Sequence, residues 1–157
     1  MKNDILKKLR SMGLPAFAEA YQKQIEQEAE YISMSFHELL MLLVDAECNS
    51  RHNNNIKRLI KNAKFSDPSA FLGNIDYLPD QHLNWNLLES LADNEYIRQG
   101  LHVILIGSTG SGKSFIANVL GVNACQSGYK TRYIRLLELF SALEAARIQG
   151  KYQQVMK

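Results

Sequence analysis

Eight consecutive residues in the second half of the chain have the composition and spacing of a phosphate-binding loop. They read G-x-x-x-x-G-K-S and are Gly107, Ser108, Thr109, Gly110, Ser111, Gly112, Lys113 and Ser114. Glycine tolerates backbone conformations that other side chains forbid, so successive N–H groups can turn inward around an anion. We expect the Lys113 ammonium to reach the β- and γ-phosphates of ATP, and the Ser114 hydroxyl to ligate Mg²⁺. The motif therefore predicts nucleoside triphosphate binding.

A loop of this kind works between a strand and a helix, and the flanking residues have suitable patterns. The apolar run 103–106 precedes it, and a helical pattern stopped by Gly128 follows it. We predict strands over 102–106 and 130–134, and helices from the loop to about 127 and over 136–147. This βαβα order favours a parallel sheet. The predicted fold class is α/β, a helical N-terminal domain followed by a truncated P-loop NTPase domain.

The first 65 residues have helical patterns. A short helix ends at Gly13, Pro15 opens a second one, and the capping box Ser35 to Glu38 begins a third. That third helix is apolar on every side over 39–44, so we expect it in the core of a small domain. We therefore predict a helical domain over 1–65 and a partial P-loop domain over 66–157. Beyond a linker, Asn84 is expected to cap another helix.

A basic amphipathic helix is predicted near the end of the first domain. Residues 51–64 contain no acid, and their cations are Arg51, Lys57, Arg58, Lys61 and Lys64. Two interpretations remain open. The cations can form an ordinary solvated face, or they can contact the phosphate backbone of double-stranded DNA.

Composition narrows the class of protein. The net charge is +2, but residues 1–100 hold 11 Lys and Arg against 14 Asp and Glu, and residues 101–157 hold 7 against 2. The cysteines and histidines lack the spacing of a metal site; they are Cys48, Cys125, His37, His52, His82 and His102. No apolar run approaches the roughly 18 residues of a membrane span. We therefore expect a cytoplasmic protein without membrane contact.

The motif lacks its usual catalytic partner in this sequence. P-loop ATPases hold the Mg²⁺ shell with an acid at the end of a later strand. After Lys113 the only acids are Glu138 and Glu144, and both lie on the predicted final helix. No catalytic residue is identifiable, and we expect no ATP hydrolysis by these residues alone, so the sequence leaves open whether the chain is an enzyme.

An ordered set of segments around the loop resembles one family. Those segments are 9–15 with Ala20, Ser35 and Phe36 before 38–40, the basic stretch 56–65, residues 75–77, 96–98, the P-loop, and 128–133 before 136–139. Together they resemble the N-terminal part of IstB-like proteins, AAA+ helper ATPases of insertion-sequence transposases that are similar to DnaC helicase loaders.

The resemblance implies more than the loop does. It implies ATP-dependent assembly of a homo-oligomer on double-stranded DNA, assisting a transposase in target selection. By resemblance to AAA+ domains, Ile75 and Tyr77 lie near the adenine. Alternatives are a DnaC-like helicase loader and a non-enzymatic DNA- or partner-binding remnant. A small-molecule P-loop kinase is disfavoured, because those enzymes usually carry the loop near the N-terminus.

Overall fold

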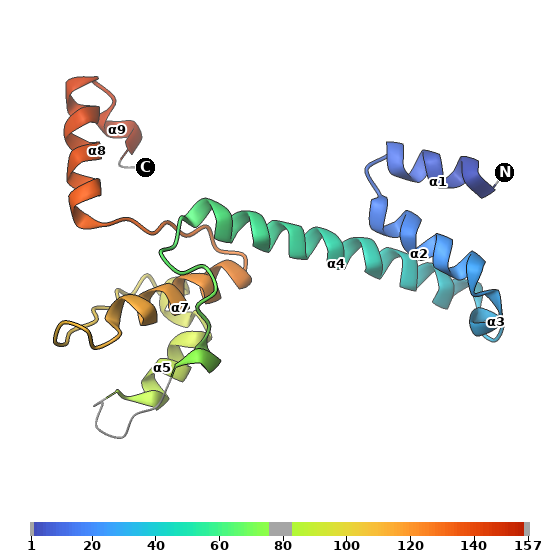
Figure 1. The fold of residues 1–157 in the computed structure, drawn as a ribbon, viewed down its shortest axis with the longest axis horizontal. Coiled ribbons are helices and arrows are strands. Elements are labelled where there is room, and N and C mark those ends of the chain that lie inside the picture. The colour runs from blue at the N-terminus through green and yellow to red at the C-terminus, as the bar shows by residue number, and fades with distance from the viewer. Residues whose placement is uncertain (1, 76–82, 156–157) are drawn as a thin grey trace. The chain divides into compact units, whose positions relative to one another are not determined.

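The computed structural model describes residues 2–75 and 83–155, and these are mostly helical (Figure 1). They divide into two compact units, Met1–Asn55 and Ile56–Lys157, with the division inside the longest helix. The domain boundary near residue 65 stays a prediction. The helices are α1 Lys2–Ser11, α2 Pro15–Glu26, α3 Glu28–Tyr31, α4 Phe36–Ala63, the 3-10 turn η1 Leu72–Asn74, α5 Trp85–Ala92, α6 Glu95–Arg98, α7 Lys113–Gln126, α8 Leu136–Ile148 and α9 Tyr152–Val155.

The predicted α/β class with a parallel sheet is wrong. Neither 102–106 nor 130–134 forms a strand, and the described residues contain no sheet. A strand exists only when another strand pairs with its backbone, whereas a helix satisfies its own N–H and C=O groups locally. The Tyr133 N–H instead donates to the Ala63 carbonyl at the end of α4, at 2.8 Å. Ile104 is 80% exposed and Ile106 is 91% exposed, so no second layer covers this segment.

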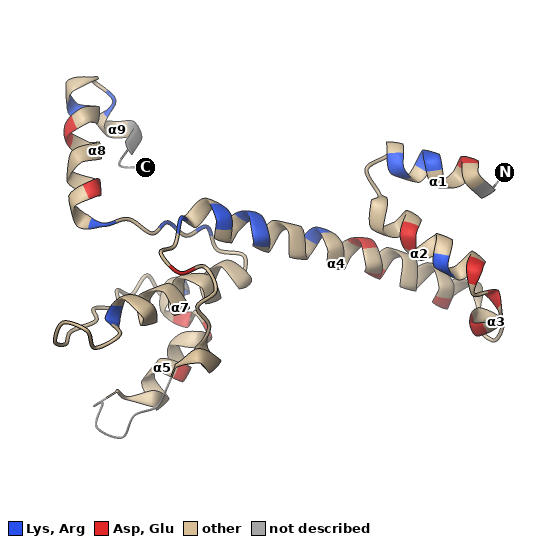
Figure 2. Cartoon of the chain, viewed as in Figure 1, with Lys and Arg blue, Asp and Glu red and all other residues tan. Residues whose placement is uncertain are grey.

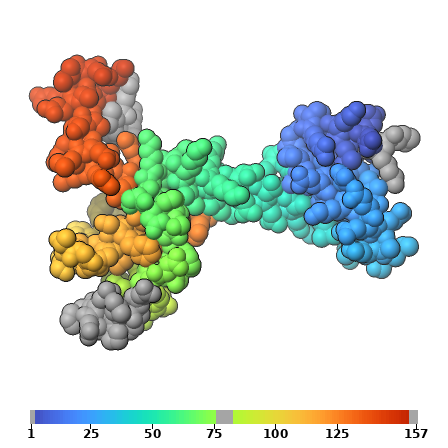
Figure 3. All heavy atoms as spheres, in the orientation of Figure 1, coloured from blue at the N-terminus to red at the C-terminus, as the bar shows by residue number. Residues whose placement is uncertain are grey.

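The helix signals in the first unit are confirmed. Gly13, with φ of +74°, follows α1, and Pro15 is the first residue of α2. The capping box before α4 is reciprocal. The Ser35 N–H donates to Glu38 Oε2 at 2.7 Å, and the Glu38 N–H donates to Ser35 Oγ at 3.3 Å. In Figure 3 the atoms of α1 and α2 lie against each other.

The apolar start of α4 is not the core helix that its composition predicts. Of residues 39–44, Leu43 is buried, whereas Leu40, Met41, Leu42 and Val44 are exposed. A helix that is apolar all round needs partners on every side. Within the first unit, α2 meets α4 along one side, where the Gln24 amide donates to the Leu39 carbonyl.

A buried carboxylate joins α2 to α4. Leu14, the N-cap residue of α2, provides no side-chain cap. Glu47 Oε2 accepts the N–H groups of Ala16 and Phe17, each at 3.1 Å, and so serves as the cap from α4. The other carboxylate oxygen of Glu47 accepts from Arg51 Nε at 2.8 Å. This Arg51 hydrogen bond is the main cause that holds the pKa of Glu47 below its ordinary value.

The second unit is built around α7. Cys125 of α7 packs in a cluster with Leu59 and Ala63 of α4, and Phe65 borders it. Ile116 and Leu120 of α7 form another cluster with Leu88 of α5, whose predicted cap is confirmed because Asn84 Oδ1 accepts the Leu87 N–H at 3.0 Å. These contacts hold α7 against both neighbouring helices, and the loop predicted to bind phosphate leads into the N-terminus of α7.

Candidate nucleotide-binding site

The loop enters α7 through two left-handed glycines. Gly110 has φ of +83° and Gly112 has φ of +79°, a region that residues with a side chain rarely adopt. Gly112 is the N-cap of α7, and no side chain caps this helix end. The first turn therefore presents backbone N–H groups and the positive end of the helix dipole to a ligand.

The loop closes tightly on itself at its first glycine. We call the concave side of the loop between Gly107 and Lys113 the cradle. A Cβ added at Gly107 would lie 2.9 Å from Ser111 Oγ and 3.7 Å from Lys113 Cδ, so a side chain there would fill the cradle. The Ser111 N–H donates to the Ser108 carbonyl at 3.3 Å. A residue with a side chain at position 107 would therefore collide with Ser111, so the loop requires glycine there.

The Lys113 ammonium lies over this cradle. It donates to the Ser108 carbonyl and to Ser111 Oγ, the latter at 3.3 Å. Thr109 and Gly110 are exposed and Lys113 is half-buried, so an anion can approach the ammonium from solvent. The Lys113 ammonium, the uncapped N–H groups and the helix N-terminus lie in one place and form a site suited to phosphate.

The buried polar side chain nearest to the loop, Asn118, holds α7 in place and does not face a ligand. Asn118 is 2% exposed, and its amide donates to the Ser114 carbonyl at 2.9 Å and to Ser66 Oγ at 2.8 Å. The Ser114 residue is exposed one turn earlier, at the position expected for Mg²⁺. No sequence motif pointed to Asn118, because its partner Ser66 is 52 residues away.

The comparison with protein families decides the identity of the chain. The model of the family described as IstB-like ATP binding protein matches residues 7–157, which include the whole loop. The chain belongs to this IstB-like family.

Curated relatives of this IstB-like chain are named after insertion sequences. A protein of Pseudomonas fluorescens, named as an ATP-binding protein of insertion sequence IS1162, is 34% identical over 100% of this chain and 68% of its own length. A Sinorhizobium fredii protein, also named as an insertion-sequence ATP-binding protein, is 31% identical over 100% of this chain and 62% of its own length. The IstB-like chain thus spans roughly two thirds of these relatives.

Of the two residues predicted near adenine, the structure describes Ile75. Ile75 is half-buried and packs against the cluster of Leu88, Ile116 and Leu120, beside the first turns of α7. Tyr77 lies outside the described residues. The adenine contact of the IstB-like chain therefore stays a prediction.

The cations predicted to contact DNA fall into two groups. Lys57, Arg58, Lys61 and Lys64 are exposed in the second unit, toward the end of α4 and just after it (Figure 2). Arg51 lies in the first unit, where it pairs with Glu47 and donates to the Gly13 carbonyl at 3.0 Å. The helix is amphipathic as predicted, because Leu59 and Ala63 on its other side are buried.

Other chemistry has little support. Within the described ranges, no three His, Cys, Asp or Glu side chains gather as a metal site. Glu138 and Glu144 are exposed on α8. Residues 2–75 and 83–155 include no helix with the length and apolar composition needed to cross a bilayer.

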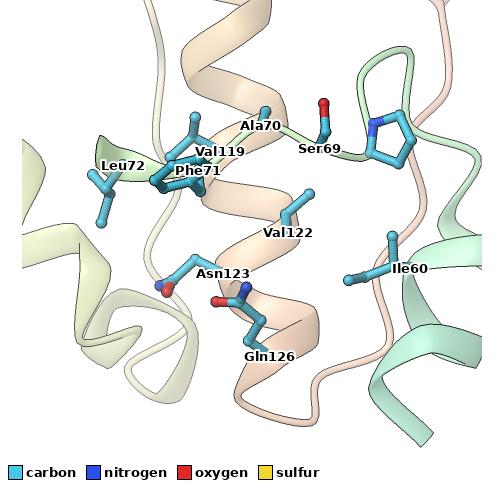
Figure 4. A pocket seen from close by; sticks show the side chains of 10 residues that line it. Ile60, Ser69, Ala70, Phe71, Leu72, Val119, Val122, Asn123 and Gln126 are labelled. Carbon is cyan, nitrogen blue, oxygen red and sulfur yellow. The ribbon is translucent and has the colours of Figure 1, made fainter. Parts of the chain in front are cut away.

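A cavity of about 410 Å³ lies along α7, away from the loop (Figure 4). Its walls come from the end of α4, residues 68–72 and the later turns of α7. Val119 and Val122 provide apolar surface there, and Asn123 and Gln126 provide amides. The lining contains none of the loop residues and no charged side chain, so it is unsuited to phosphate.

Proposed function

We propose that this chain is the ATP-binding part of a helper protein for DNA transposition. It binds Mg-ATP at residues 107–114, assembles with further copies on double-stranded DNA in the cytoplasm, and assists a transposase in target selection. The observation that carries the proposal is the cradle itself. Two left-handed glycines, an uncapped helix N-terminus and Lys113 meet in one loop of an IstB-like chain.

Nucleotide binding is tested by isothermal titration with Mg-ATP. Lys113→Ala should abolish binding, because the charge that pairs with the phosphates is lost from a site made for anions. Lys151→Ala, which removes an exposed lysine beyond α8, is the matched control and should bind like the unaltered chain. Equal affinity of Lys113→Ala and the unaltered chain would refute the assignment.

Magnesium is assigned to the Ser114 hydroxyl. Ser114→Ala should bind ATP with an affinity that no longer depends on Mg²⁺, whereas the unaltered chain should bind more tightly with Mg²⁺ than with EDTA. A Ser114→Ala variant that keeps the full Mg²⁺ effect would exclude this hydroxyl as a ligand.

DNA binding is assigned to the exposed cations of α4. We expect weak, salt-dependent binding to duplex DNA of any sequence. Replacing Lys57 and Lys61 by Ala should flatten the slope of log affinity against log salt by about one unit for each lost cation. An unchanged slope would leave these lysines as an ordinary solvated face.

The transposase partner follows from the family and from its relatives' names. The test is co-purification with the transposase encoded by the same element. Capture of a hexameric helicase, with no capture of the transposase, would instead make the chain a helicase loader.

A further inference from the structure

We propose that the end of α4 and residues 130–132 form one groove that holds a phosphodiester of duplex DNA. This inference rests on the DNA binding proposed above and adds a second segment to it. Arg58, Leu59 and Asn62 of α4, with Lys130 and Thr131, line a cavity of about 340 Å³. We name these five residues the basic groove; the exposed Arg132 follows Thr131 directly in the chain.

A tertiary hydrogen bond brings the two segments together. The Tyr133 N–H donates to the carbonyl of Ala63, the last residue of α4, at 2.8 Å. Gly128, with φ of +88°, follows the end of α7 and begins the connection that contains Tyr133. Figure 2 shows Lys and Arg both on the last turns of α4 and on the connection between α7 and α8. Residues distant in the sequence thus share one surface of the second unit.

The charge of this surface is one-sided. Lys130 lines the groove together with Arg58, and both are exposed. Arg132 and Lys61 are exposed as well, two residues after Lys130 and three residues after Arg58 in the chain. Neither 51–66 nor 127–137 contains an acid. The C-terminus of α4 contributes about half a negative charge. Four cations outweigh that dipole, and the Tyr133 N–H already satisfies one of its carbonyls.

The groove also has neutral donors that suit a phosphodiester. The Asn62 amide and the half-buried Thr131 hydroxyl line the groove together with Arg58 and Lys130. Amides and hydroxyls flanked by Lys and Arg are the usual contacts to DNA phosphates, which position a protein without selecting a sequence. The groove therefore fits the backbone of duplex DNA, independent of its base sequence.

The experiment is fluorescence anisotropy of a labelled duplex between 50 and 200 mM salt. The groove variant carries Lys130→Gln and Arg132→Gln, and the control carries Arg147→Gln and Lys151→Gln, two exposed cations elsewhere in the same unit. Loss of two phosphate contacts should flatten the slope by about 1.8 units and weaken binding about 60-fold at 0.1 M salt. The control should match the unaltered chain.

The outcomes separate this inference from the proposed function. If Lys57 and Lys61 replacements flatten the slope but the groove variant does not, the inference is wrong and the DNA function stands. If the unaltered chain binds no duplex, both fail. If the groove variant loses Mg-ATP affinity instead, the groove holds nucleotide phosphates and the inference is overturned. The single variants Lys130→Gln and Arg132→Gln, each expected to flatten the slope by about 0.9 units, test the same point if the double variant unfolds.

Discussion

Gly121 in the middle of α7 provides a quantitative test of the packing that positions the loop. A Cβ added there would lie 2.5 Å from Cε1 and 2.9 Å from Cζ of Phe65. Contacts this short force the ring of Phe65 out of its place beside Leu59, Ala63 and Cys125. We therefore predict that Gly121→Ala destabilises the second unit, although alanine is the better helix former.

The two opposing effects can be estimated. Gly to Ala inside a helix stabilises it by about 1 kcal/mol. Overpacking a well-packed core by one methyl group costs about 1–3 kcal/mol. The net effect of Gly121→Ala is then a loss of about 0–2 kcal/mol. In a Phe65→Leu background the two short contacts disappear, because leucine lacks Cε1 and Cζ and its branch ends near Cδ1, at an ordinary 3.5 Å.

The test is a double-mutant cycle measured by urea unfolding. Trp85 is the only tryptophan in the chain, and it packs beside Leu88, Ile116 and Leu120 in the second unit. Its fluorescence therefore reports the unfolding of the unit that contains Gly121. We expect Gly121→Ala to stabilise the Phe65→Leu chain by about 1 kcal/mol. The coupling free energy should be about 1–3 kcal/mol.

A coupling below about 0.5 kcal/mol would refute the reasoning, because independent sites add within that margin. It would mean that the ring of Phe65 yields without cost and that α7 is not held against the end of α4 by this contact.

Three further predictions concern the helix caps and the missing acid. The hydrogen bond from Arg51 lowers the pKa of Glu47, so the stability that the Glu47 carboxylate contributes should be lost as the pH falls below 4.5. Helix content, measured as ellipticity at 222 nm, should therefore fall in acid. Glu47→Gln should make this fall smaller, and the control Glu19→Gln should leave it unchanged. Asn84→Ala should lower the free energy of unfolding by about 1 kcal/mol in the same fluorescence assay, whereas Asn84→Asp, which keeps a capping oxygen, should lower it little. Equal stability of Asn84→Ala and the unaltered chain would show that this cap does not stabilise α5. The 157-residue chain should aggregate or melt at low temperature, because large apolar side chains such as Ile104 and Ile106 are exposed. It should release no more phosphate from ATP than Lys113→Ala, because no acid among the described residues is placed to organise Mg²⁺. A cooperative melt with Lys113-dependent turnover would contradict both expectations.

Local signals in the sequence predicted the helices well because helix ends depend on residues a few positions apart. The capping box at Ser35, the Asn84 cap and the stops at Gly13 and Gly128 appear where their residue types indicate. Two glycines of the loop, Gly110 and Gly112, likewise adopt left-handed conformations that favour glycine. In each case the deciding interactions lie within a few residues of the signal.

Features that depend on distant partners were missed or wrongly predicted. The segment 102–106 has strand-like composition, but a strand needs a second strand beside it, and none of the described residues provides one. The apolar run 39–44 suggested a core, yet whether an apolar helix face is buried depends on which elements pack against it. The excess of cations in 101–157 was the only sequence signal for Lys130 and Arg132, and it did not indicate their neighbours.

The sequence by itself therefore determined most helix boundaries and the family, and it predicted the phosphate-binding loop, because each is a short-range pattern or an ordered set of such patterns. Tertiary structure alone decided that Glu47 caps α2, that Asn118 holds Ser66, and that residues 130–132 join Arg58 at the end of α4. These contacts join residues 30 or more positions apart. Their partners are chosen by how helices pack, and no spacing along the chain encodes that choice.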